Sequence, residues 1–175
     1  INPGDYLPDV FAEPNSLYRG SDFSFQEVIP RGGAAVELIH TSRGVAVGDI
    51  DNDGGMDLVV VNRDAATYVM LNRIGNQGNW IRFSLFEANG LAARGANISA
   101  LVGDRRINRY QQVEGSYLAS SDPRIHFGLN DQLEITDVIV QWSDGKTENF
   151  GSFKAGKEII LTRSDSVVNS ELEQK

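Results

Sequence analysis

Short apolar runs rich in β-branched residues, separated by glycine-containing turns, are the feature that most constrains the fold of this chain. Runs such as GVAVGDI (44–50) and MDLVVVN (56–62) are too short for ordinary helices and have the composition of strands. Seven further runs have the same character: 67–72, 79–87, 96–103, 107–115, 124–129, 135–143 and 158–163. Turn signals separate them at Asp53-Gly54, Asn89-Gly90, Gly103-Asp104 and Asp144-Gly145. No window has a convincing helical period, so the sequence predicts an all-β fold.

The composition limits the classes of partner. The chain has 175 residues, which suits one domain or two small ones, and its 41% of hydrophobic residues suits a globular protein. A formal net charge of −8 disfavours nucleic acid and anionic membrane surfaces, because both repel an acidic protein. The absence of cysteine excludes disulfides, thiolate metal sites and cysteine catalysis. No apolar run approaches the ~20 residues of a spanning helix, so we expect no membrane insertion.

The acidic run DIDNDGGMD, residues 49–57, has four aspartates in nine positions. Carboxylates this close repel one another unless a cation neutralises them, and Ca2+ takes six to eight oxygen ligands. Alternate positions point to the inside of a tight turn, and a glycine at the sixth position allows the positive φ that the turn needs. The predicted calcium ligands are the side chains of Asp49, Asp51, Asp53 and Asp57 and the carbonyl of Gly55.

This loop differs from an EF-hand. An EF-hand has a bidentate glutamate at its twelfth position, where this chain has Val60, and it lies between helices rather than strands. The alternative is an ordinary Asp-Gly hairpin turn, but such a turn needs one or two aspartates rather than four. The sequence therefore predicts a calcium loop that joins two β-strands.

The segment SRGVAVGDIDNDGGMDLVVVNRD (42–64) resembles the FG-GAP or VCBS-type propeller repeat, a calcium-binding strand–loop–strand of integrin-like and bacterial surface proteins. The chain after it resembles the ASPIC and UnbV domain. The matching pieces are GNWIRFSL (78–85), AARGANISALV (92–102), VEGSYLASSDPRIHFGL (113–129) and VIVQWSDGKTE (138–148). The resemblance implies the same calcium ligands and a non-catalytic adhesion or surface-recognition module. It also implies an exported protein, located extracellularly, at the cell surface or in the periplasm.

Two departures accompany the resemblance. The chain carries one complete calcium loop where relatives usually have several, and it reads Trp142-Ser143-Asp144-Gly145 where relatives often have a proline after the tryptophan.

The glycine-rich polar stretch 74–79 predicts a domain boundary. We expect blade-like material over residues 1–75, an antiparallel β-sandwich over 76–163 and a polar tail over 164–175. Propellers close with about 4–8 blades, and the first segment holds at most one complete blade and part of another. Its apolar strand 58–61 therefore needs a cover. A second copy of the chain would give a homodimer, which we expect, and folding back would give a monomer. Because the chain starts at Ile1 without a signal-like segment, we expect a mature form or a piece of a longer protein.

Two other functions are compatible with the sequence. A carbohydrate-binding module would use exposed aromatic rings, with Tyr117 as the best candidate, because Trp80 and Trp142 lie in alternating strands that favour the core. An adhesion module would bind a protein and a carbohydrate-binding module would bind a glycan. The sequence predicts a ligand of one of these two classes and does not identify it.

A hydrolase is the second alternative. Ser116, His126 and Asp122 could form a triad, and Glu114 with Asp122 could form an acid pair, but the chain has no nucleophile elbow and no phosphate-binding loop. We therefore expect no enzymatic activity.

Overall fold

The computed structural model describes residues 10–21, 23–63 and 65–164. Contacts divide the chain into two compact units. The first contains Ile1–Asn76 and Val113–Asp122, and the second contains Gln77–Gln112 and Pro123–Lys175. The segment Val113–Asp122 therefore lies between two parts of the second unit in sequence but packs with the first. The predicted tail 164–175 lies outside the described residues except for Ser164.

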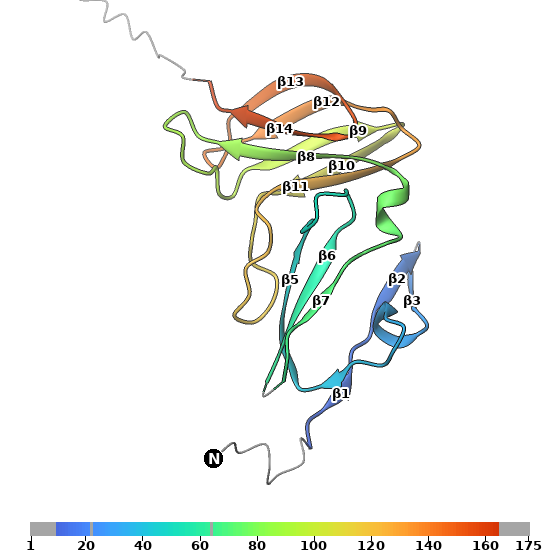
Figure 1. Ribbon diagram of the computed structural model, residues 1–175. Helices are drawn as coiled ribbons and strands as arrows, with labels where there is room; N and C mark the ends of the chain where they lie inside the picture. Colours follow the sequence, from blue (N-terminus) through green and yellow to red (C-terminus); the bar gives the residue numbers. More distant parts are fainter. Residues whose placement is uncertain (1–9, 22, 64, 165–175) are drawn as a thin grey trace, which may run out of the picture. The chain divides into compact units, whose positions relative to one another are not determined.

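The predicted all-β class is confirmed, with strands that form five sheets in the described part of the chain (Figure 1). Within the same residues, helical structure is limited to two three-residue 3-10 turns, η2 (Arg31–Gly33) and η3 (Gly75–Gln77). Neither is long enough to cross a membrane.

The first unit is built around an antiparallel sheet in the order β5-β6-β7, with bounds β5 (Ser42–Gly48), β6 (Asp57–Asn62) and β7 (Tyr68–Met70). Val47 lies opposite Leu58, which lies opposite Met70, so these side chains share one face. The other face carries Val59 opposite Val69. Both faces are apolar, and the second is partly open to solvent, because Val69 is 60% exposed.

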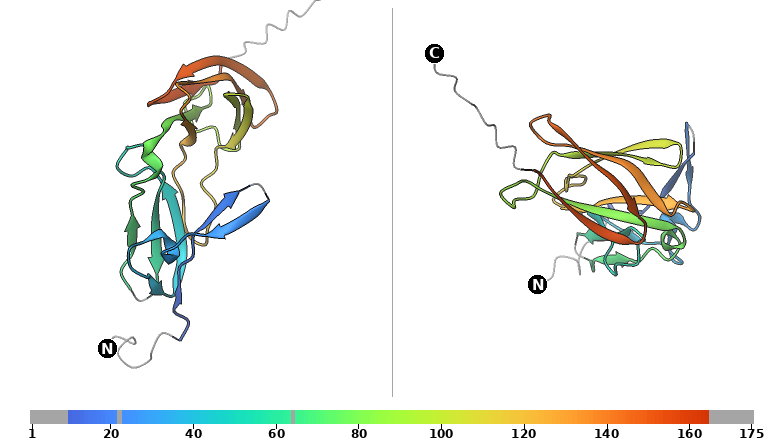
Figure 2. Two further views of the ribbon diagram at one scale, coloured as in Figure 1. Left: turned by 90° about the vertical axis from the view of Figure 1, so that its right-hand side faces the viewer. Right: turned by 90° about the horizontal axis from the view of Figure 1, so that it is seen from above.

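Two short antiparallel pairs complete the first unit. One joins β1 (Glu13–Pro14) to β4 (Ile39–His40), and the other joins β2 (Tyr18–Ser21) to β3 (Ser24–Glu27). The β2–β3 hairpin projects away from the β5-β6-β7 sheet, as the left view of Figure 2 shows.

The second unit is a β-sandwich of a four-stranded and a three-stranded sheet (Figure 2, right). The four-stranded sheet has the order β10-β9-β12-β13, with bounds β9 (Asn97–Val102), β10 (Arg105–Tyr110), β12 (Glu134–Gln141) and β13 (Thr147–Lys154). The three-stranded sheet has the order β11-β8-β14, with bounds β8 (Asn79–Phe86), β11 (Ile125–Asn130) and β14 (Lys157–Thr162). Every pair is antiparallel except β8 and β14, which run in the same direction.

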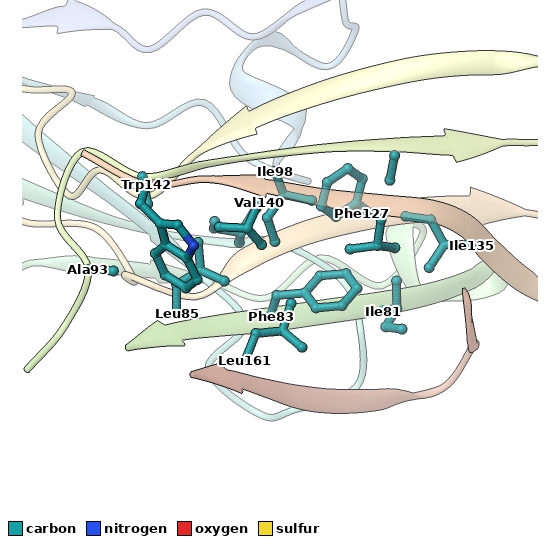
Figure 3. Packing of buried hydrophobic residues seen from close by; sticks show 14 of the residues in the cluster. Ile81, Phe83, Leu85, Ala93, Ile98, Phe127, Ile135, Val140, Trp142 and Leu161 are labelled. Atoms are coloured by element: carbon teal, nitrogen blue, oxygen red, sulfur yellow. The ribbon is translucent and has the colours of Figure 1, made fainter. Parts of the chain in front are cut away.

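The sandwich core follows the two-residue alternation of its strands. Ile81, Phe83 and Leu85 on β8 are fully buried and face the other sheet (Figure 3). The rings of Phe83 and Phe127 meet edge to face, with centroids 5.8 Å apart. A fully buried side chain of this kind contributes about 1.5–3 kcal/mol through the hydrophobic effect. This cluster gives the second unit a core of its own.

The sequence predicts most strands within two residues at each end and misses others. The run 107–115 is shorter as a strand, because β10 ends at Tyr110 and the chain then leaves for the first unit. The strand β13 was not predicted. The core reading of the tryptophans is correct for Trp142, which is 2% exposed, and wrong for Trp80, which is outside the core cluster.

Candidate metal centre

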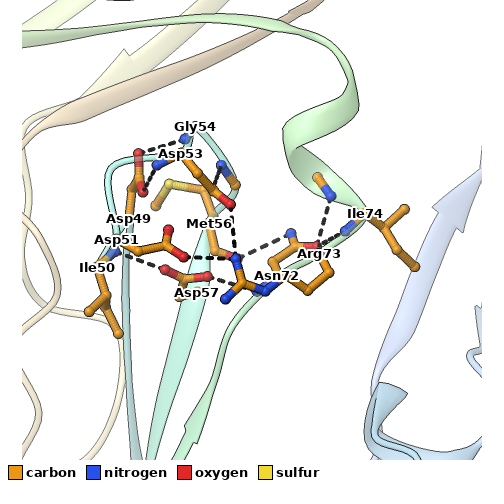
Figure 4. Close-up of polar contacts among 12 residues, drawn as sticks. Asp49, Ile50, Asp51, Asp53, Gly54, Met56, Asp57, Asn72, Arg73 and Ile74 are labelled. Atoms are coloured by element: carbon orange, nitrogen blue, oxygen red, sulfur yellow. Dashed lines mark hydrogen bonds and ion pairs between the residues drawn. The ribbon is translucent and has the colours of Figure 1, made fainter.

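The acidic loop is the connection of the β5–β6 hairpin. Gly48 pairs with Asp57 at the last position of the ladder, so Asp49 and Asp57 leave the two strands at adjacent points. The Ile50 amide donates a hydrogen bond of 2.8 Å to Oδ2 of Asp57 and closes the base of the loop (Figure 4). The strand pairing therefore brings the first and last predicted ligands together.

The loop turns as its glycine predicts. Gly54 has a φ of 91°, and Asn52 also has a positive φ, of 60°. The amides of Asp53 and Gly54 donate hydrogen bonds of 3.1 and 3.0 Å to the two carboxylate oxygens of Asp49. Backbone donors thus orient the Asp49 carboxylate from inside the turn.

Three carboxylates form a compact group. Asp49, Asp51 and Asp57 each offer one oxygen, and these oxygens lie within 4.8 Å of one another. Oxygens that bind one calcium ion at about 2.4 Å are at most about 4.8 Å apart, so the spacing fits a shared ion. Asp49 is 3% exposed and Asp57 is 1% exposed, which removes them from the water that would otherwise screen their repulsion. Their hydrogen bonds leave capacity for a cation, because an ionised carboxylate has about four acceptor positions.

The structure places Asp53 outside this compact group. Its Oδ1 accepts a hydrogen bond of 2.8 Å from the Gly55 amide, and its Oδ2 lies 3.5 Å from the Arg73 guanidinium. Arg73 also lies 3.0 Å from Oδ2 of Asp51. A side-chain rotation of Asp53 away from Arg73 would be needed before Asp53 joined the other three as a ligand.

Sequence reasoning missed Asn72, which lies two residues after the end of β7 and holds the loop in place. Its backbone amide donates a hydrogen bond of 2.8 Å to Oδ1 of Asp57. Its side-chain Nδ2 donates one of 3.2 Å to the Met56 carbonyl. A Cβ added to Gly55 would lie 2.8 Å from the Asn72 carbonyl oxygen, so Gly55 permits this close approach. No sequence pattern signals these contacts, because two strands, β6 and β7, separate Asn72 and Arg73 from the loop.

The residues proposed for the hydrolase alternative make other contacts in the structure. Oγ of Ser116 accepts a hydrogen bond from the Val45 amide, and the Asp122 amide donates to the Val47 carbonyl. The His126 ring stacks on Trp80 at a centroid distance of 6.2 Å. Glu114 is exposed. An acid pair does line an open depression of about 800 Å3, but both residues, Asp131 and Glu134, are exposed.

An ionic and aromatic cluster lies on the outer face of the three-stranded sheet. Arg82 is only 6% exposed, and its guanidinium carbon lies 5.0 Å from the centre of the Trp80 ring. Oε2 of Glu158 on β14 lies 3.4 Å from Nε of Arg82 and 3.6 Å from a guanidinium nitrogen of Arg124. This cluster explains why Trp80 is half-buried without being part of the core.

Comparisons with known proteins find similarity over most of the chain. Residues 87–168 match the family model described as ASPIC and UnbV. The chain is 33% identical to cartilage acidic protein 1 of Homo sapiens over 145 residues, which cover 78% of this chain and 22% of that protein. It is also 33% identical to cartilage acidic protein 1 of Mus musculus over 119 residues, which cover 65% of this chain and 18% of that protein. The chain thus spans less than a quarter of these relatives. Its similarity identifies an ASPIC and UnbV domain and homology to part of cartilage acidic protein 1.

Proposed function

We propose that residues 49–57 bind Ca2+ and that the chain is a calcium-stabilised, non-catalytic recognition or adhesion module of an exported protein. In this proposal the β5–β6 hairpin is an FG-GAP or VCBS-type repeat placed before the ASPIC and UnbV domain. The similarity to that family and to cartilage acidic protein 1 supports the non-catalytic, exported character.

The observation that carries the calcium proposal is the burial of Asp49 and Asp57 beside Asp51. Arg73 alone cannot neutralise the four aspartates of the loop, and its side chain is 63% exposed, which weakens its pairing with Asp51. A divalent cation would offset the repulsion directly. Excess ligand stabilises a folded protein by about 2.7 kcal/mol at a hundredfold excess over its Kd.

Thermal melts in calcium and in chelator test this proposal. We expect a higher Tm in calcium, no such shift for Asp51→Asn, and a weaker effect of Mg2+, which demands a smaller and near-octahedral shell. Asp104→Asn is the matched control, because it removes one charge from the exposed β9–β10 turn and should keep the calcium shift. Identical wild-type melts in the two buffers would refute calcium binding.

A glycan is the second candidate ligand, supported by the exposure of Tyr117. Its side chain is 68% exposed, whereas Trp142 is too deeply buried to stack on a sugar. Binding on a glycan array that disappears with Tyr117→Ala would favour this candidate, and a blank array would favour a protein partner.

A further inference from the structure

The outer edge of β5 is bonded to a segment from far along the sequence, Val113–Asp122, which we call the strap. The amides of Val45 and Val47 donate hydrogen bonds of 3.0 and 3.2 Å to the hydroxyl oxygens of Ser116 and Ser121. The Asp122 amide donates a hydrogen bond of 2.9 Å to the Val47 carbonyl. Serine side chains therefore supply the acceptors that a neighbouring strand would supply from its backbone. Figure 1 shows the strap beside β5.

Two glycines of β5 allow the strap to approach this closely. A Cβ added to Gly44 would lie 2.5 Å from the carbonyl oxygen of Tyr117, and one added to Gly48 would lie 2.9 Å from Cβ of Asp122. Neither glycine has a positive φ, so the requirement for glycine comes from the strap rather than from the backbone conformation of β5. The close approach of the strap therefore requires glycine at both positions, one near the start of β5 and one at its end.

The strap holds a strained turn at its tip. The Ala119 amide donates a hydrogen bond of 3.3 Å to the Ser116 carbonyl. Leu118, within this turn, has a φ of 48°. Leucine seldom adopts this conformation, and such strain persists only where surrounding contacts fix the backbone. Tyr117 and Leu118 are exposed at 68% and 89%, so their own side chains do not supply that fixation. The bonds of Ser116 and Ser121 to β5 do.

We propose that the strap positions β5 for metal binding, so that strap docking and calcium binding at residues 49–57 stabilise each other. The Asp122 end of the strap packs on Gly48, which directly precedes the candidate ligand Asp49. Docking therefore fixes the strand from which the first ligand projects. Thermodynamic linkage requires the reverse effect of the same size: calcium must hold the strap in place. This inference rests on the proposed calcium function, but the docking of the strap does not.

Limited proteolysis in chelator tests docking alone. Chymotrypsin cleaves after Tyr117 and Leu118, and mass spectrometry identifies the products. We expect Gly44→Ala to accelerate this cleavage on the order of tenfold, because loss of one or two hydrogen bonds raises the undocked population by about that factor. Gly115→Ala is the matched control, because its added Cβ would meet nothing within 4 Å and its φ is not positive. Equal cleavage of the two variants would overturn strap docking.

Calcium titration by calorimetry tests the coupling. We expect Gly44→Ala to bind calcium at least about fivefold more weakly than wild type and Gly115→Ala, and we expect calcium to slow wild-type cleavage. The double variant Ser116→Ala/Ser121→Ala should reproduce both effects more mildly without a steric clash. Calcium binding of equal affinity in all variants would overturn the coupling. No calcium binding by wild type would instead refute the proposed function, while the chelator experiment would still decide docking.

Discussion

Asp57 and Asp51 belong to the same candidate metal group, yet the structure predicts that their removal in the absence of metal destabilises the protein to very different extents. Asp57 is 1% exposed, and its two oxygens accept hydrogen bonds of 2.8 Å from the amides of Ile50 and Asn72. Asp57→Ala leaves both amides without this acceptor. Because a hydrogen bond to a charged group contributes about 1.5–3 kcal/mol, the variant should lose about 3–6 kcal/mol of unfolding free energy in chelator.

Asp51→Ala should lose less than about 1 kcal/mol under the same conditions. Its contact with Arg73 is a partly exposed ion pair, and such pairs contribute about 0–1 kcal/mol. Removal of Asp51 also relieves its repulsion by Asp49 and Asp57. In calcium, both variants should lose the stabilisation that the ion gives to wild type.

The position of the tryptophans makes this experiment selective. Trp80 and Trp142 both belong to the second unit, and the first unit contains no tryptophan. Urea unfolding followed by circular dichroism reports on both units, whereas tryptophan fluorescence reports on the second. The loss caused by Asp57→Ala should appear in circular dichroism more strongly than in fluorescence. Equal destabilisation by Asp57→Ala and Asp51→Ala in chelator would refute the assignment of hydrogen-bonding and charge roles.

Two further predictions concern the second unit. A hydrogen bond from Arg163 lowers the pKa of Asp144 from its ordinary value of 3.8. The folded-state pKa lies below the unfolded one, so this contact stabilises the fold above about pH 4 and is lost as the pH falls through the folded-state pKa. Thermal melts from pH 7 to 2 should therefore show wild type above Asp144→Asn at neutral pH and a difference that vanishes in acid; a constant difference would contradict this. Phe83→Ala should cost about 3–5 kcal/mol, measured by tryptophan fluorescence in urea, because Phe83 is fully buried between Phe127 and Phe153. A loss below 1 kcal/mol would contradict the packing of this core.

Local sequence patterns account for much of the fold and for the shape of the acidic loop. The apolar run 79–87 predicts the strand β8, and the structure confirms it. The buried face was predicted wrongly, because Trp80 was expected in the core, whereas Ile81, Phe83 and Leu85 on the opposite face form it. The Asp53-Gly54 turn signal predicts the positive φ at Gly54. The strand and the turn depend on neighbours within a few residues, which is why one sequence suffices to predict them.

Features made by distant residues were not predicted. The strand β13 has few apolar residues and contains Gly151, with a φ of 77°, where its pairing with β12 shifts register. Its place comes from β12 rather than from its own pattern. Asn72 and the strap likewise take their roles from contacts with the β5–β6 hairpin, which no local periodicity encodes. The separation of Asp53 from the compact acidic group depends in turn on Arg73.

The parallel pairing of β8 with β14 has a consequence for the order of folding during synthesis. β8 opens the second unit and β14 is its last described strand, so the edge of β8 stays open until Thr162 has left the ribosome. The first unit also cannot complete its edge strand β5 early, because Ser116 and Ser121, which accept hydrogen bonds from β5, are synthesised later with the strap. Such pairings between distant segments form slowly, and unpaired edges promote aggregation. Nascent chains arrested before residue 113 should therefore depend on chaperones for solubility, and chains released after Thr162 should not.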